Sequence, residues 1–102
     1  MRRGEIWFAA VTDGDRPVLV LTRDPVADRI GYVVVAAVTR TRRGLTSELE
    51  LTPRLDGVPT ACVVNFDSLH TIARDRFRRL VTTLPDQRMA QACDRLAHST
   101  GC

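Results

Sequence analysis

The sequence predicts a mainly β protein of the α+β class, in which a small, partly closed antiparallel barrel carries one helix on its side. Short, β-branched apolar runs at 18–21 and 33–38 indicate core strands, and strict alternation of Glu and Leu over 48–51 indicates another. Apolar residues recur at helical spacing after Pro85. About six short strands followed by a single helix therefore suggest this architecture.

The chain begins with a predicted hairpin over residues 2–21. Alternation places Ile6 and Phe8 on one face of its first strand, and the polar residues at 12–15 form its turn. A polar connector at 24–29 is too short to predict a helix, and it leads to the second core strand.

Loops and strands alternate in the second half of the chain. Residues 39–44 form a basic loop, and the Asp, Gly and two Pro residues at 53–59 predict a further loop. The apolar run at 61–66 is a strand that His70-Thr71-Ile72 continues or resumes. A last short strand is expected at 80–84.

The alternating strand at 48–51 is expected to have one face in water.

A C-terminal helix is predicted after the last strand, with Pro85 in its first turn, Asp86 near its positive end and Gly101 at its end. Its apolar positions are Met89, Ala92, Cys93, Leu96 and Ala97.

Size and composition indicate a soluble globular protein. The 102 residues fit one domain, 1–102, and 44% hydrophobic with 26% charged residues is an ordinary balance. No apolar run approaches the roughly 20 residues of a membrane span, and the N-terminus lacks a signal-peptide pattern, so we expect a cytoplasmic protein without membrane contact. Cys62, Cys93 and Cys102 lack the spacing of a metal site, and we expect the first two to be reduced core residues.

The chain is mildly basic, with a net charge of +3. All 15 of its basic residues are arginine, whose planar guanidinium suits bidentate contact with phosphate. Codon bias in a GC-rich genome produces the same composition. Nucleic acid or an acidic protein is therefore the first partner class to consider.

Two polar residues flank the core strands. Arg16 stands just before the run at 18–21, and Thr39 stands just after the run at 33–38. If these strands pair as antiparallel neighbours, Arg16 and Thr39 share one rim of the sheet, where a guanidinium and a hydroxyl face the same groove. From the residues alone, a solvated hairpin position is the simpler interpretation of Arg16.

Four motifs occur in order along the chain: Arg3-Gly4-Glu5-Ile6-Trp7, Arg16-Pro17-Val18-Leu19-Val20-Leu21, Ala37-Val38-Thr39, and VVNFDSLHTI at 63–72. Each motif alone is weak. Together, in this order and spacing, they resemble the MazF/PemK family of bacterial toxins, and especially its short mycobacterial-type members.

The resemblance implies an SH3-like barrel of the CcdB/PemK toxin fold and a homodimer. It implies the toxin of a type II toxin–antitoxin system, a sequence-specific endoribonuclease (mRNA interferase) that cuts single-stranded RNA without a metal or other cofactor. A cognate, MazE-like antitoxin would inhibit it by placing a disordered acidic segment in the RNA groove. The family's catalytic Arg and Thr match Arg16 and Thr39.

The expected chemistry is attack of the ribose 2′-hydroxyl on the adjacent phosphorus, which gives a 2′,3′-cyclic phosphate and a 5′-hydroxyl. An arginine can neutralise the charge that builds on the phosphate oxygens, and a threonine hydroxyl can hold the phosphate or relay a proton. Neither Arg16 nor Thr39 is an obvious base near neutral pH, so positioning and electrostatics are expected to supply most of the rate.

Further RNA contacts are expected at two places. Arg40, Arg42 and Arg43 follow the threonine, and for them phosphate contact and a solvated loop are equally good interpretations. Asp67 and Ser68 stand where many relatives have an Asp-Gln or Glu-Gln pair that touches bases.

Other positions depart from the family pattern or have a structural interpretation. Many relatives carry a Gly-Ser-Glu segment before the Arg-Pro motif, whereas here only 11–15 remain, with Asp13 or Asp15 as candidate substitutes. His70 alternates with apolar neighbours and is expected to be a structural or interface residue. Trp7 is expected in core or dimer packing.

The main rival is a non-enzymatic toxin on the same fold, similar to the CcdB proteins that poison DNA gyrase by contact. A non-catalytic nucleic-acid-binding module is a third possibility. The pair of Arg16 and Thr39 favours the enzyme, because a gyrase poison needs no such pair.

Overall fold

A computed structural model describes residues 1–11, 14–23, 29 and 31–102 of the chain. Within these residues, six strands form one antiparallel sheet in the order β4-β5-β3-β2-β1-β6. The strands are β1 (Glu5–Ala10), β2 (Asp15–Val20), β3 (Tyr32–Thr39), β4 (Glu48–Leu51), β5 (Cys62–Ala73) and β6 (Phe77–Thr83). The helical segments are α2 (Pro53–Asp56), a 3₁₀ turn (Arg74–Arg76) and α3 (Asp86–Thr100).

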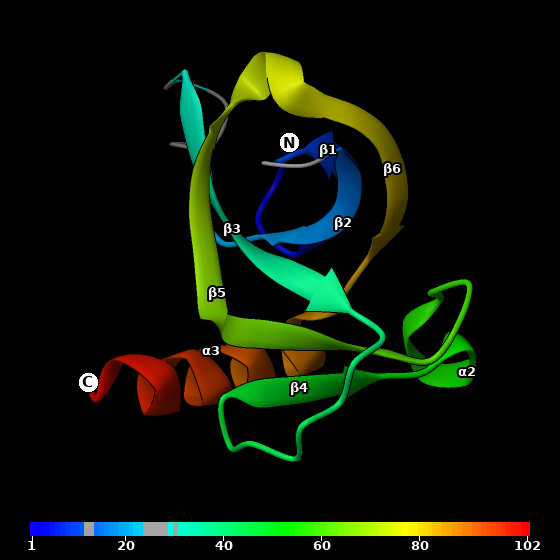
Figure 1. Ribbon diagram of the computed structural model, residues 1–102, viewed down its shortest axis with the longest axis vertical. Helices are drawn as coiled ribbons and strands as arrows, with labels where there is room; N and C mark the ends of the chain where they lie inside the picture. Colours follow the sequence, from blue (N-terminus) through cyan, green and yellow to red (C-terminus); the bar gives the residue numbers. More distant parts are fainter. Residues whose placement is uncertain (12–13, 24–28, 30) are drawn as a thin grey trace.

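The sheet curls strongly, so that β6 arches over β1 and β2 while α3 lies against β4 and part of β5 (Figure 1). This arrangement confirms the predicted mainly β fold, a partly closed antiparallel barrel with one C-terminal helix. No helix in the described ranges has the length and apolarity needed to cross a lipid bilayer.

The N-terminal half contains the strand pairs that the sequence predicted. β1 and β2 form the hairpin expected over 2–21, with Ile6 opposite Leu19. β2 in turn pairs antiparallel with β3. The predicted turn residues Thr12 and Asp13 lie outside the described residues, as does the predicted connector at 24–29 apart from Arg29.

The apolar run at 61–66 and its continuation form one strand of 12 residues, β5. Its pairing with β3 is irregular, because Ala36 lies opposite Leu69 while the next residue, Ala37, lies opposite Asn65. Three residues of β5 are thus left over, and such a bulge bends a strand and increases its twist. Figure 1 shows the resulting bend in β5.

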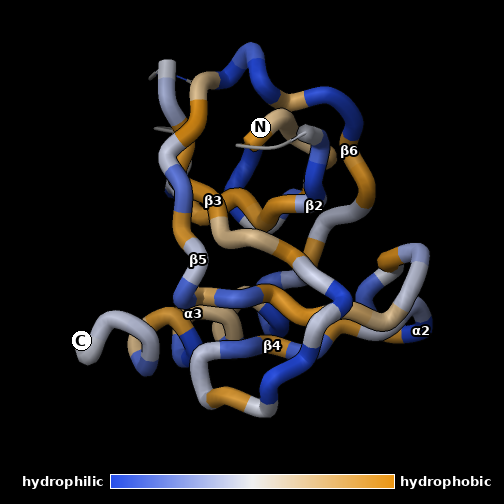
Figure 2. The backbone as a smooth tube through the Cα atoms, in the orientation of Figure 1, coloured by the Kyte–Doolittle hydropathy of each residue, from blue (hydrophilic) through white to orange (hydrophobic). Residues whose placement is uncertain are grey.

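The curl creates two hydrophobic clusters, and hydrophobic residues follow both β2 and β3 (Figure 2). The first cluster includes Phe66 and Ile6 and is closed by α3. The second includes Ala9, with Trp7 and Phe77 packed at its edge as an edge-to-face pair at 5.9 Å, as expected for a packing role of Trp7. Burial of each large apolar side chain contributes about 1.5–3 kcal/mol.

One prediction for β4 is wrong. The alternation of Glu and Leu predicted a face in water, but Glu48 is only 6% exposed. Its carboxylate accepts hydrogen bonds from the backbone N–H groups of Arg43, Gly44 and Leu45, at 3.0 to 3.3 Å. These donors offset the cost of removing the carboxylate from water, so β4 has one exposed glutamate, Glu50, rather than two.

The segment predicted as a loop at 53–59 contains a helical turn, α2. Thr52 caps it by accepting the N–H of Leu55 at 3.3 Å, and Gly57 ends it with a φ of 73°. The buried carboxylate of Asp56 pairs with Arg88 of α3 at 2.8 Å. This pair ties α2 to α3.

The C-terminal part follows the prediction with small shifts. β6 begins at Phe77, earlier than the strand expected at 80–84. Pro85 is the N-cap of α3 rather than part of its first turn, and Gly101 ends the helix as expected. Cys93 is exposed rather than in the core, because the buried face of α3 is formed by Met89 and Ala92 and Cys93 lies outside that face.

Candidate active site

Arg16 and Thr39 lie level with each other on neighbouring strands. In the β2–β3 ladder, Val18 lies opposite Ala37. Continued by two residues along each strand, this register places Arg16 opposite Thr39. Because side chains alternate along a strand, both then point to the same face of the sheet. Both residues line the same two hollows in the surface, so they share a groove as their positions in the sequence predicted.

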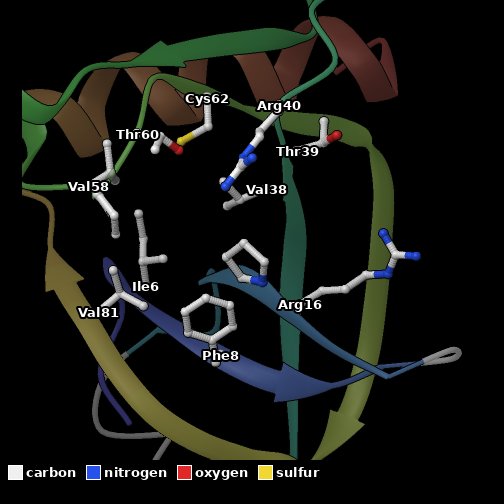
Figure 3. Close-up of a pocket in the computed structure, with 12 residues that line it drawn as sticks. Ile6, Phe8, Arg16, Val38, Thr39, Arg40, Val58, Thr60, Cys62 and Val81 are labelled. Atoms are coloured by element: carbon white, nitrogen blue, oxygen red, sulfur yellow. The ribbon is translucent and has the colours of Figure 1, made fainter.

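The first of these, the apolar hollow, has a volume of about 400 Å³. In Figure 3 the side chains of Arg16 and Thr39 lie at the edge farthest from Val58 and Val81, and Arg40 points inward beside Cys62. Most of its wall is hydrocarbon, from Ile6, Phe8, Pro17, Val38, Val58, Pro59 and Val81. This wall can cover an apolar or aromatic group next to the two candidate catalytic residues.

The second, the polar hollow, has a volume of about 450 Å³ and lies between β2, β3 and β5. Arg16, Thr39 and the buried Val38 border both hollows. The other polar side chains of its wall are Thr41, Arg43, Asn65, Ser68 and His70.

The Thr39 hydroxyl is already oriented. Its oxygen accepts the backbone N–H of Thr41 at 3.2 Å, and the side chain is half-buried. A hydroxyl that accepts one bond keeps its own hydrogen for another acceptor. Thr39 can therefore donate to an oxygen placed in the groove beside the exposed Arg16.

The three arginines of the basic loop go to different places. Arg40 lines the apolar hollow and Arg43 the polar hollow. Arg42 forms an exposed ion pair with Glu50 at 3.2 Å and borders neither. The backbone bonds to Glu48 fix the loop at Arg43, so the structure brings two of the three predicted RNA-binding arginines to Arg16 and Thr39.

The two predicted contacts on β5 also separate. Ser68 lines the polar hollow, whereas the Asp67 carboxylate accepts the Ser47 hydroxyl. The Asp67 N–H donates to the Asn65 side chain at 2.9 Å, which holds the bulge of β5 in shape. Asp67 thus has structural partners and lines neither hollow.

His70 lines the polar hollow with Arg16 and Thr39, although the sequence indicated only a structural or interface role. The pattern of β5 shows that His70 and Ile72 share a face, but only the pairing with β3 shows which face this is. The bulge shifts that pairing, so sequence alternation could not place His70 in the groove.

Of the two candidate substitutes in the short first loop, the structure describes Asp15. Asp13 lies outside the described residues, and the exposed Asp15 lies 3.8 Å from Arg78 as an ion pair. Asp15 is therefore engaged with β6.

The electrostatics of both hollows favour anions. Their described lining residues include Arg16, Arg40 and Arg43 but no carboxylate. Guanidinium groups pair with phosphate through two parallel N–H bonds. Burial raises the pKa of the Cys62 thiol in the apolar hollow, Asp56 adds to the rise, and Arg40 opposes it. Among the described residues, no three His, Cys, Asp or Glu side chains cluster as metal ligands.

Comparison with known proteins found a matching family model and a similar sequence. The family model of the PemK-like, MazF-like toxin of type II toxin–antitoxin systems matches residues 2–100. The probable endoribonuclease MazF2 of Mycobacterium tuberculosis is 67% identical over 102 residues, the full length of both chains.

Solved structures are similar over nearly the whole chain. The M. tuberculosis toxin MazF-mt6 superposes with a TM-score of 0.87 and 29% identity, covering 95% of this chain and 96% of that one. A mycobacterial endoribonuclease in complex with its cognate antitoxin superposes with a TM-score of 0.88, covering 99% and 95%. At 22% identity, the second likeness concerns the fold.

Proposed function

The chain belongs to the PemK-like, MazF-like toxins of type II toxin–antitoxin systems, and from this premise we propose that it is an endoribonuclease that cuts single-stranded RNA with Arg16 and Thr39. The observation that carries the proposal is the register of β2 and β3, which sets the two residues level in one cationic groove. The 67% identity to the probable endoribonuclease MazF2 along the full chain supports the same activity. These matches do not favour a CcdB-like gyrase poison.

The proposed reaction is attack of the ribose 2′-oxygen on the adjacent phosphorus. The O5′–P bond breaks, which leaves a 2′,3′-cyclic phosphate on one fragment and a 5′-hydroxyl on the other. Arg16 stabilises the charge on the non-bridging oxygens through paired N–H bonds, and Thr39 donates its hydroxyl hydrogen to one of them. A guanidinium and a hydroxyl supply this stabilisation themselves, so the proposed step needs no metal.

Neighbouring groups hold the strand on both sides of the cut. Arg40 and Arg43 are placed to bind flanking phosphates, because each lies in one of the hollows that meet at Arg16 and Thr39. The apolar hollow suits a base turned out of its stack, since single-stranded RNA is recognised through such bases. The physiological substrate in this proposal is cytoplasmic RNA.

Two protein partners belong to the proposal. One is a cognate antitoxin, MazE-like and acidic, whose segment occupies the cationic groove. The other is a second copy of the chain, because Tyr32, Val34 and Leu69 are exposed on one face of paired strands β3 and β5. Such an apolar stripe suits a dimer interface, and sedimentation analysis of the purified protein checks it.

The test is cleavage of a long, mixed-sequence, single-stranded RNA in EDTA by the wild type and by Arg16→Ala. We expect discrete cuts with cyclic-phosphate ends from the wild type, and a rate at least about 100-fold lower from the variant. Arg54→Ala is the matched control, since Arg54 is an exposed arginine of α2 outside both hollows. Equal cutting by the wild type and Arg16→Ala, or cutting that EDTA abolishes, contradicts the proposed mechanism.

A further inference from the structure

The proposed cleavage needs a group that takes the proton of the attacking 2′-hydroxyl, and neither Arg16 nor Thr39 is suited to this. A guanidinium stays protonated in proteins, and a hydroxyl is a weak base near neutral pH. Apart from His70, the described side chains lining the polar hollow are apolar, amide, hydroxyl or guanidinium groups. Imidazole is the side chain that ordinarily exchanges a proton near neutral pH, so His70 has the chemistry that the others lack.

His70 also lies on the required face of the sheet. It pairs with Val35 on β3, and Val35 and Thr39 point to the same face because they are four residues apart on one strand. Four residues span roughly 13 Å at about 3.3 Å per residue. His70 of β5 and Arg16 of β2 thus line the polar hollow from positions several residues apart along the sheet.

The imidazole has a partner that can orient it. Ser68 Oγ lies 3.3 Å from His70 Nε2, and both side chains are half-buried. When Nε2–H donates to the serine oxygen, the lone pair resides on Nδ1. The bulge of β5 brings Ser68 to the hollow, where its hydroxyl can orient the His70 ring. The same bulge is the reason that sequence alternation could not place His70 in the groove.

The charged and titratable groups around His70 come from several elements. Arg16 of β2 and Arg43 of the basic loop share the polar hollow with it. On its other side, Tyr32 of β3 and Arg76 of the 3₁₀ turn share a further hollow with it. No carboxylate lines either hollow in the described part of the chain, so no Asp or Glu there competes with His70 for the role of general base.

We propose that His70 is a catalytic residue that accepts the 2′-hydroxyl proton during RNA cleavage, a role that rests on the ribonuclease function proposed above. As the O2′–P bond forms, the proton passes to the imidazole. The O5′–P bond then breaks, and the leaving oxygen takes a proton from water. The imidazolium returns its proton to the solvent, which restores the enzyme with no net change in protons.

The experiment measures the rate of cleavage against pH in EDTA, under single-turnover conditions, on an RNA oligonucleotide that contains a mapped cut site. We expect His70→Gln to slow cleavage by about 100-fold or more and to remove the acidic limb of the wild-type pH profile. Binding of the same oligonucleotide with a 2′-deoxy substitution at the cut should stay within about threefold of the wild type. His98→Gln is the matched control, since His98 is exposed on α3, 3.8 Å from Asp94.

Rescue separates a catalytic role from a structural one. Added imidazole should restore part of the rate of His70→Ala but not that of Arg16→Ala, because a free base can replace only a missing base. A His70→Gln variant that keeps its rate and its acidic limb overturns the His70 proposal, as does a slow His70→Ala that imidazole does not rescue. In either case the ribonuclease function stands if Arg16→Ala is inactive. If the wild type cuts no RNA, the function itself fails.

Discussion

The two hollows that meet at Arg16 and Thr39 differ in their walls although they are similar in volume. The apolar hollow is walled mainly by hydrocarbon, whereas the polar hollow is walled by arginine, amide, hydroxyl and imidazole groups. Apolar walls hold a base by desolvation and stacking, but polar walls can exchange protons and pair with phosphate. Under the proposed function, this difference places base binding mainly on one side of Arg16 and Thr39 and proton exchange on the other.

The largest effect on the cleavage rate should come from a change in the wall that the two hollows share, which includes Thr39. Thr39→Val keeps the shape of the side chain and removes the hydroxyl, so we expect the single-turnover rate to fall by about 10²- to 10³-fold, as for loss of one donor to a transition state. Thr60→Val is the control, because Thr60 lines only the apolar hollow. A fall of similar size in both variants would contradict the division between the hollows.

The next largest effect should come from Glu48, whose carboxylate anchors the loop that carries Arg43 of the polar hollow. Glu48→Gln weakens the three acceptor bonds that hold the loop at Arg43, Gly44 and Leu45, and we expect the free energy of unfolding to drop by about 1–3 kcal/mol. Glu50→Gln removes only an exposed ion pair with Arg42 and should cost about 0–1 kcal/mol. Urea denaturation measures both, and equal losses would show that the burial of Glu48 has no energetic consequence.

Salt dependence tests whether RNA spans both sides. If a phosphate lies in each hollow, Arg40→Ala and Arg43→Ala should each reduce the slope of log affinity against log salt by about 0.7, the value for one contact to a single strand. Fluorescence anisotropy with a labelled, 2′-deoxy-substituted oligonucleotide over a range of salt concentrations measures this slope. A change in only one variant would confine the RNA backbone to that hollow.

The smallest effect concerns the thiol of the apolar side. Because burial raises the pKa of Cys62, less thiolate forms at a given pH, and iodoacetamide should modify Cys62 more slowly than the exposed Cys102. The raised pKa also means that the folded protein keeps this proton where the unfolded chain has lost it, so stability falls as pH rises between the two pKa values. Mass spectrometry of each cysteine over a pH series tests the rate, and faster modification of Cys62 would contradict it.

Sequence periodicity was sufficient for the strand pairs that carry the catalytic candidates. The runs at 18–21 and 33–38 are too short and too β-branched for helices, and adjacent antiparallel strands bring Arg16 beside Thr39. These are local rules, because the alternation of side chains and the pairing of neighbours in sequence require no knowledge of distant contacts. They failed at Glu48, whose donors arrive from a loop that only the folded chain closes.

The sequence by itself therefore determined the class of fold, the family and the groove shared by Arg16 and Thr39. Tertiary structure alone decided which neighbours enter that groove. The bulge of β5 turns Ser68 and His70 into it, while Asp67 bonds to Ser47 and Arg42 to Glu50 outside it. The physical reason is that a bulge resets the register of a strand, and the face on which each later side chain lies then depends on its pairing with a distant partner.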